Sequence, residues 1–206
     1  MGIVLGRARR ERVAALPLLV APAANAHTGL VGHGDFLAGF LHPLSTIEDV
    51  LAYLAIGILA ALQSPRCKSA LPLFWIANAG GLAAALALPV NTTVDAVNIA
   101  SLVILGGIVA ADVAVPRSLL FGTALAFGAS HGVTNGAAVV SGIAPYLFLP
   151  GAATAAIVAS AYGYVTTENL LQEDRLWIRI ALRTAGSWLA AIGMLVLATT
   201  WKARFG

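Results

Sequence analysis

A few histidine and acidic residues lie inside or beside long apolar stretches of this 206-residue chain. His42, Glu48 and Asp49 fall near the start of one stretch, and His131 falls in the middle of another. Burying an ionisable side chain in a membrane costs free energy, so such residues usually mark a binding site or a pathway. Imidazole nitrogens and carboxylate oxygens also bind divalent metal ions. These residues therefore predict a site for a divalent cation.

His131 has polar neighbours at helical spacing. Thr134 and Asn135 follow it by three and four residues, which places all three on roughly one face of a helix. An acid from a neighbouring helix could reach His131, and we expect the Glu48-Asp49 segment to supply it. A buried histidine that only helps to pack the helices is the alternative interpretation.

Glycines recur at every fourth position beside His131, at Gly128, Gly132 and Gly136. Such a ridge of small residues lets a second helix approach closely. This glycine face could receive the helix that carries the acid. It could also pair the chain with a second copy of itself or with a larger membrane complex.

The segment before the first apolar stretch has features of a helix start. Pro43 fits there because that position needs no backbone donor, and Ser45 or Thr46 could cap the helix. The two acids that follow would be favoured by the helix dipole. Capping alone does not explain two adjacent acids. Together with His42, they could bind a divalent cation.

The first 26 residues have the pattern of a secretory signal peptide. Four arginines precede a short apolar run, Val13–Ala24, and Ala24-Asn25-Ala26 resembles a cleavage site. The run of about a dozen residues is too short to span ~30 Å of hydrocarbon. The whole chain has a net charge of +3, but cleavage would leave eight basic and eight acidic residues. The mature chain would then be formally neutral, so its charge indicates no nucleic-acid partner. An uncleaved anchor is the alternative.

Cleavage after Ala26 would make His27 the first residue of the mature chain. Its free amine and its imidazole could chelate a metal ion together, and His33 and Asp35 follow. We therefore expect His27 and His33 to collect metal ions at the outer face. A flexible polar tail is the alternative.

Composition places the whole chain in a membrane. Hydrophobic residues make up 59% of it and charged residues 10%, against about 25% charged in soluble domains. A single cysteine, Cys67, excludes a disulfide framework. We predict an all-α membrane protein, in which residues 1–26 are the signal peptide and residues 27–206 form a six-helix domain in contact with lipid. The predicted spans are Ile47–Leu62, Ala70–Leu88, Val94–Val115, Leu119–Val140, Tyr146–Thr166 and Leu176–Thr200, after a re-entrant or interfacial stretch Gly34–Leu41.

Basic residues in the short connections predict the orientation. Arg66, Arg117 and Arg175 lie in the first, third and fifth connections, whereas the second and fourth have none. Because basic connections face the cytoplasm, both ends of the mature chain should face the periplasm of a bacterial inner membrane. Asp112, late in the third span, could pair with Arg117 or cap the chain.

These features together resemble the HupE/UreJ family of nickel-permease-like membrane proteins. The signal peptide that ends before a histidine, the His42-Pro43 pair and Ser130-His131-Gly132 carry the resemblance, together with the six-span layout. The family's first motif reads roughly H-P-x-x-G-x-D-H and the fourth-span motif roughly H-G-x-x-H-G.

The sequence departs from both motifs. Thr46 stands at the glycine, Glu48 at the aspartate and Asp49 at the second histidine of the first motif, and Asn135 stands at the second histidine of the other. The resemblance implies metal ligands at His42, Glu48, Asp49, His131 and Asn135. Two imidazoles are then replaced by oxygen ligands, which favours harder ions than nickel.

Two functions of different classes follow. The first is a permease for a divalent transition metal, nickel or cobalt by resemblance, which is passive or coupled to a gradient because no ATP-binding motif is present. The second is a non-transporting accessory subunit of a larger membrane complex. A channel for a small neutral molecule has no specific support. We expect no enzymatic activity and no organic cofactor, because the metal ion would be the substrate and the connections are too short for an active site.

Overall fold

The computed structural model describes residues 34–64, 69–87 and 92–205. The predicted signal peptide, His27 and His33 lie outside these residues. The described part of the chain is entirely helical. Its helices are α1 (Asp35–Ser45), α2 (Ile47–Leu62), α3 (Ala70–Ala84), α4 (Thr92–Ala111), α5 (Arg117–Gly136), α6 (Pro145–Leu171) and α7 (Leu176–Phe205).

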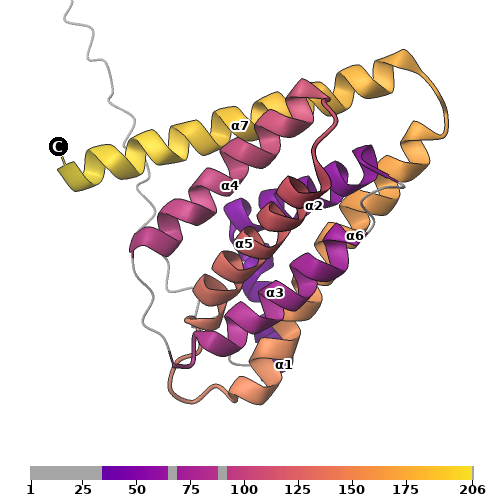
Figure 1. Cartoon of the computed structure of the whole chain (residues 1–206). Coiled ribbons are helices and arrows are strands. Elements are labelled where there is room, and N and C mark those ends of the chain that lie inside the picture. Colours follow the sequence, from indigo (N-terminus) through magenta and orange to yellow (C-terminus); the bar gives the residue numbers. More distant parts are fainter. Residues whose placement is uncertain (1–33, 65–68, 88–91, 206) are drawn as a thin grey trace, which may run out of the picture.

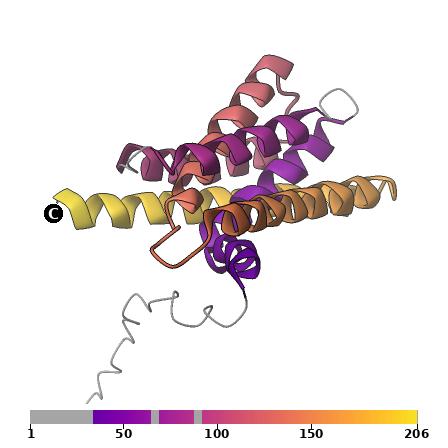
Figure 2. The ribbon, with the colours of Figure 1, turned by 90° about the horizontal axis from the view of Figure 1, so that it is seen from below.

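The helices pack mainly side by side. Figure 1 shows α4 beside α7 and α3 beside α5, and the long helix α6 packs against both α1 and α2. Seen from below, α1 is viewed end-on while α6 and α7 run across the view (Figure 2). Helix α2 joins the pairs, because it contacts α4 and α3 as well as α6. The functional site lies around its first turns.

Glycines set the spacing of these helix pairs. A Cβ atom on Gly132 or Gly81 would collide with the backbone across the α3–α5 contact. The same holds for Gly57 in the α2–α6 contact and for Gly106 and Gly186 in the α4–α7 contact. Small residues let helix backbones approach within van der Waals contact, which is the main source of helix association in lipid.

The predicted stretch before the first span is a separate helix, α1, which meets α2 at a bend of 81°. Pro43 lies in the last turn of α1, so the expectation that it starts the next helix is wrong. Thr46 has extended backbone angles and occupies the N-cap position of α2 without a side-chain capping bond. Ser45 instead donates a hydrogen bond to the carbonyl of His42 at 2.6 Å, satisfying an acceptor at the end of α1.

A helix covers the greater part of each of the six predicted spans. Among the described residues, α4, α6 and α7 are long and apolar enough to cross a membrane, and the bent pair of α1 and α2 would make a fourth span. Helix α3 is apolar but has only 15 residues. The structure thus supports three to four spans, and the crossing by α3 and α5 stays a prediction.

The three predicted cytoplasmic connections begin or lie at one end of the molecule. The side chain of Gln63, just after α2, donates to the carbonyl of Val113 at 2.9 Å and accepts from the amide of Val115 at 3.0 Å. Arg179, in the first turn of α7, pairs with Asp112 after α4. These contacts bring the end of α2, the α4–α5 connection and the start of α7 together, and the orientation of this end in the membrane stays a prediction.

Candidate functional site

A buried acid–imidazole pair links two helices of the described structure. Nδ1 of His131 lies 2.5 Å from Oδ1 of Asp49, which joins α5 to the first turn of α2. Asp49 is 6% exposed and His131 is fully buried. The sequence predicted that the Glu48-Asp49 segment would bring an acid to His131, and in the structure Asp49 makes this contact.

The other nitrogen of His131 faces α4. Nε2 lies 3.0 Å from Oγ of Ser101, and Ser101 donates its single hydroxyl hydrogen to the carbonyl of Asn98 at 2.6 Å. Nε2 must therefore donate to Ser101. A second proton must lie between Nδ1 and Asp49, because a bare nitrogen would repel a carboxylate oxygen at that distance. The pair as a whole then carries no net charge, which reduces its burial cost.

Asn135 completes the surroundings of Asp49. Its amide nitrogen donates its two hydrogens to Oδ2 of Asp49 at 3.0 Å and to the carbonyl of His131 at 2.9 Å, and the hydroxyl of Tyr53 lies 3.3 Å from the same nitrogen. The Tyr53 ring also stands edge-on to the His131 ring, with 5.6 Å between centroids. Helices α2 and α5 therefore hold the acid, the imidazole and the amide as one packed group.

A cavity of about 380 Å³ reaches this group. It lies among the end of α1, the start of α2, α4, α5 and the last turns of α7. The lining includes His42, Thr46, Glu48, Asp49, Asp95, Asn98, His131, Thr134 and Asn135. Carboxylates, imidazoles and amides thus gather at a single hollow.

The sequence analysis missed the contribution of α4. Asp95, Asn98 and Ser101 follow one another at intervals of three, which places them near one face of the helix. Asp95 and Asn98 line the cavity, and Ser101 holds His131. This spacing of polar residues within an apolar span was the signal that could have identified them.

The remaining predicted ligands are only partly brought together. His42 and Glu48 line the same cavity as Asp49, and the His42 ring rests on Phe148 with 5.8 Å between centroids. In the described ranges, no three His, Cys, Asp or Glu side chains are placed to hold one metal ion. The structure therefore brings Asp49, His131 and Asn135 into contact and leaves His42 and Glu48 at the wall of the hollow.

The glycine face does not receive the helix that carries the acid. Gly128, Gly132 and Gly136 are buried against α3, close to the carbonyls of Phe74, Asn78 and Leu82. Asp49 reaches His131 from α2 instead. The expectation that the glycine ridge receives the helix with the acid is therefore wrong, because the ridge packs against α3. The face that the sequence offers for self-association is already covered within one chain.

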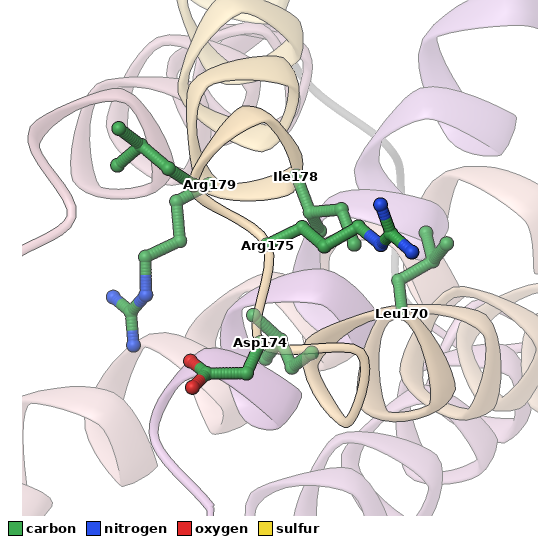
Figure 3. A pocket seen from close by; sticks show the side chains of 7 residues that line it. Leu170, Asp174, Arg175, Ile178 and Arg179 are labelled. Carbon is green, nitrogen blue, oxygen red and sulfur yellow. The ribbon is translucent and has the colours of Figure 1, made fainter.

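A second hollow, of about 240 Å³, lies at the turn between α6 and α7. Figure 3 shows that the guanidinium groups of Arg175 and Arg179 point in different directions, so they do not converge on one ligand. Arg179 pairs with Asp112 at 3.0 Å, and Arg175 lies 3.7 Å from Glu173. These charges are explained by pairing at an exposed turn.

This pairing also corrects one expectation. Asp112 binds Arg179 rather than Arg117, whose guanidinium lies 5.8 Å from the centre of the Phe121 ring. Asp112 has a positive φ of 51° just after α4, and its amide contacts the carbonyls of Ile108 and Val109. The residue thus ends α4 through its backbone, as the alternative interpretation expected.

Comparison with protein families identifies the family to which the chain belongs. The family described as HupE / UreJ protein matches residues 14–196, which is most of the chain. The chain belongs to the HupE / UreJ family. Members are associated with nickel or cobalt transport or with accessory roles. No curated protein and no solved structure gives a significant match. Asp49, His131 and Asn135, which the resemblance in sequence placed at motif positions, are in contact in the structure.

Proposed function

We propose that this HupE / UreJ protein is an integral membrane permease for a divalent transition-metal ion, nickel or cobalt. Transport would be passive or driven by an ion gradient. The observation that carries the proposal is the buried Asp49–His131 pair at the wall of a cavity that also holds Glu48, Asp95 and His42. Ionisable groups inside membrane helices usually mark an ion pathway.

The incomplete ligand set agrees with movement of an ion rather than storage. Conduction requires binding that is favourable enough for entry and weak enough for release, over more than one site. A cation in the cavity would keep part of its water and meet carboxylates before it reaches His131. To bind there, the ion must separate Asp49 from His131, so transport would include a rearrangement of α2 against α5.

The proposal includes the parts of the chain outside the described residues. Six spans would place both mature ends in the periplasm of a bacterial inner membrane. A signal peptide cleaved after Ala26 would expose His27, and His27 and His33 would collect ions there. The metal ion is the substrate, and we propose neither an enzymatic activity nor an organic cofactor.

The test is metal binding and flux of the purified full chain. Saturable binding of nickel or cobalt by calorimetry, and uptake into proteoliposomes, should both be lost in His131→Ala and Asp49→Ala. Glu173→Ala is the matched control, because it removes an acid that is exposed at the α6–α7 turn. Binding that survives both changes would move the metal to the His27 terminus. No binding and no flux would overturn the permease.

A non-transporting accessory subunit is the second candidate, and one observation favours it. Both nitrogens of His131 and both oxygens of Asp49 already have hydrogen-bond partners. The network could serve only to lock α2, α4 and α5 together. This candidate predicts no flux for any ion, and stable co-purification of a membrane complex that His131→Ala disrupts.

A further inference from the structure

Two amide oxygens near the acid–imidazole pair make no hydrogen bond within the described structure. Oδ1 of Asn98 and Oδ1 of Asn135 are buried, and neither has a hydrogen-bond partner among the described residues. Asn135 is 2% exposed, and both side chains line the cavity. A buried polar atom without a partner costs about 1–3 kcal/mol, so a hydrogen-bond donor or a cation that reached either oxygen would remove this cost.

The hydrogen bonds fix which way the Asn98 amide points. Oγ1 of Thr134 donates its one hydrogen to the backbone of its own helix, where the carbonyls of His131 and Ser130 lie 3.0 and 3.2 Å away. Thr134 can then only accept from Asn98, 2.8 Å away, so the nitrogen of Asn98 faces Thr134. The oxygen must be the atom left without a partner.

The Asn135 amide is fixed in the same way. Its nitrogen lies within 3.0 Å of two groups that can only accept, a carboxylate oxygen of Asp49 and the carbonyl of His131. Turning the amide over would set its oxygen against both acceptors. The unpartnered oxygen is therefore a property of the network and not of an arbitrary assignment.

The two amide oxygens have no hydrogen-bond partner, whereas the polar atoms of the acid–imidazole pair already have partners. The nitrogens of His131 and the oxygens of Asp49 are engaged with each other, with Ser101 and with Asn135. The amide oxygens can accept a ligand without breaking any of these bonds. The carboxylates of Glu48 and Asp95 line the same cavity and supply negative charge.

We propose that the amide oxygen of Asn98 joins that of Asn135 in an oxygen-donor site beside the Asp49–His131 pair. There a partly hydrated divalent cation binds before it reaches the Asp49–His131 pair. The inference rests on the proposed function and adds a first binding step on α4 and α5. Neutral carbonyl oxygens suit divalent ions of many kinds, whereas imidazole favours nickel, cobalt, copper and zinc. Capture would therefore be unselective, and selection would follow at His131.

The test uses the full chain in proteoliposomes, with nickel, cobalt and manganese measured separately. Asn98→Leu removes the oxygen at similar size and should raise KM by about tenfold for all three ions, with kcat within about twofold. Asn98→Asp keeps an oxygen ligand and adds charge but loses the amide donor to Thr134. It should lower KM. Thr184→Val is the control, because it removes a hydroxyl bonded to the Ile180 carbonyl on the exposed face of α7.

The outcomes separate the oxygen from the hydrogen bond. If Asn98→Asp raises KM as Asn98→Leu does, the bond to Thr134 matters and the oxygen site is overturned. An unchanged KM in Asn98→Leu, or a fall in kcat and thermal stability alone, also overturns it. If Asn98→Leu does not fold, the KM of Asn98→Asp decides: a lower KM supports the oxygen site, and a higher KM overturns it. A wild-type chain that moves none of the ions refutes the proposed function itself, whereas unaffected variants of a transporting chain refute only the site.

Discussion

Asp49 and His131 lie on different helices, and each depends on the other for a partner inside the protein. Removing one member of such a pair leaves an uncompensated polar group, which typically costs about 3–5 kcal/mol. Replacing both with apolar residues of similar volume is often close to neutral. Comparing the single and double replacements therefore shows whether the buried pair stabilises the fold or is retained for function.

We expect Asp49→Leu and His131→Leu each to lower the free energy of unfolding by about 3–5 kcal/mol, and the double variant to lose much less than the sum. Denaturant unfolding in detergent measures all three. Glu173→Leu, at the exposed pair with Arg175, should change stability by less than about 1 kcal/mol. Additive losses for the two buried sites would contradict this coupling.

The residue at position 135 determines whether this side of the site offers an oxygen or a nitrogen ligand. The resemblance described in the sequence analysis places a histidine of the HupE / UreJ motif at this position. Asn135→His should therefore raise the ratio of kcat/KM for nickel to that for manganese by about tenfold, because imidazole binds nickel better than it binds manganese. Transport in proteoliposomes gives both values, and thermal unfolding checks that the variant is folded. A ratio that does not move would show that Asn135 does not contact the ion.

The sequence allowed the acid and the imidazole to be predicted together, but not their neighbours. Ionisable residues are rare in apolar spans, so Asp49 and His131 stand out without a structure. Asn98 and Ser101 stand out less, because single amides and hydroxyls also form hydrogen bonds between membrane helices. Only their spacing from Asp95 indicated a shared helix face. Their role depends on how α4 is rotated about its axis, which hydropathy alone does not determine.

The helices themselves follow from apolar length, and their contacts do not. The range predicted for the first span, Ile47–Leu62, is the range of α2. Helix α1 was expected only as a re-entrant or interfacial stretch, because Pro43 obscures a helix that continues to Ser45. The glycine ridge on α5 correctly indicated a close helix contact, but α3 and α2 were equally compatible with its pattern.

The α3–α5 contact should be sensitive to one methyl group. A Cβ on Gly132 would overlap the carbonyl of Asn78, whereas a Cβ on Gly122 of the same helix meets nothing within 4 Å. Gly132→Ala should lower the free energy of unfolding by about 1–3 kcal/mol, which is typical of overpacking. Gly122→Ala should leave it unchanged or raise it by up to about 1 kcal/mol through helix propensity. Equal effects in the two variants would mean that the helices are not in close contact.

At the scale of the whole molecule, the two ends have different chemistry. One end has the bond from Gln63 to the α4–α5 connection and the ion pair between Asp112 and Arg179. Towards the other end, Asp35 accepts a hydrogen bond from the amide of Ala144, and the cavity is lined by Asp95 and by Thr200 of α7. The predicted inward side thus has an ion pair and an amide bond between connections, and the acidic cavity lies towards the predicted outer side. A cation would then enter from the periplasm.

This orientation can be tested with the single cysteine of the chain. Cys67 lies in the connection between α2 and α3, beside Arg66 and Lys68, so it should face the cytoplasm. A membrane-impermeant maleimide should label it in inside-out vesicles and not in intact spheroplasts. Cys67→Ser combined with Ser141→Cys moves the thiol to an exposed site in the α5–α6 connection and should reverse the pattern. Labelling of both thiols from the same side would mean that α3 and α5 do not both cross the membrane, and the six-span arrangement would have to be abandoned.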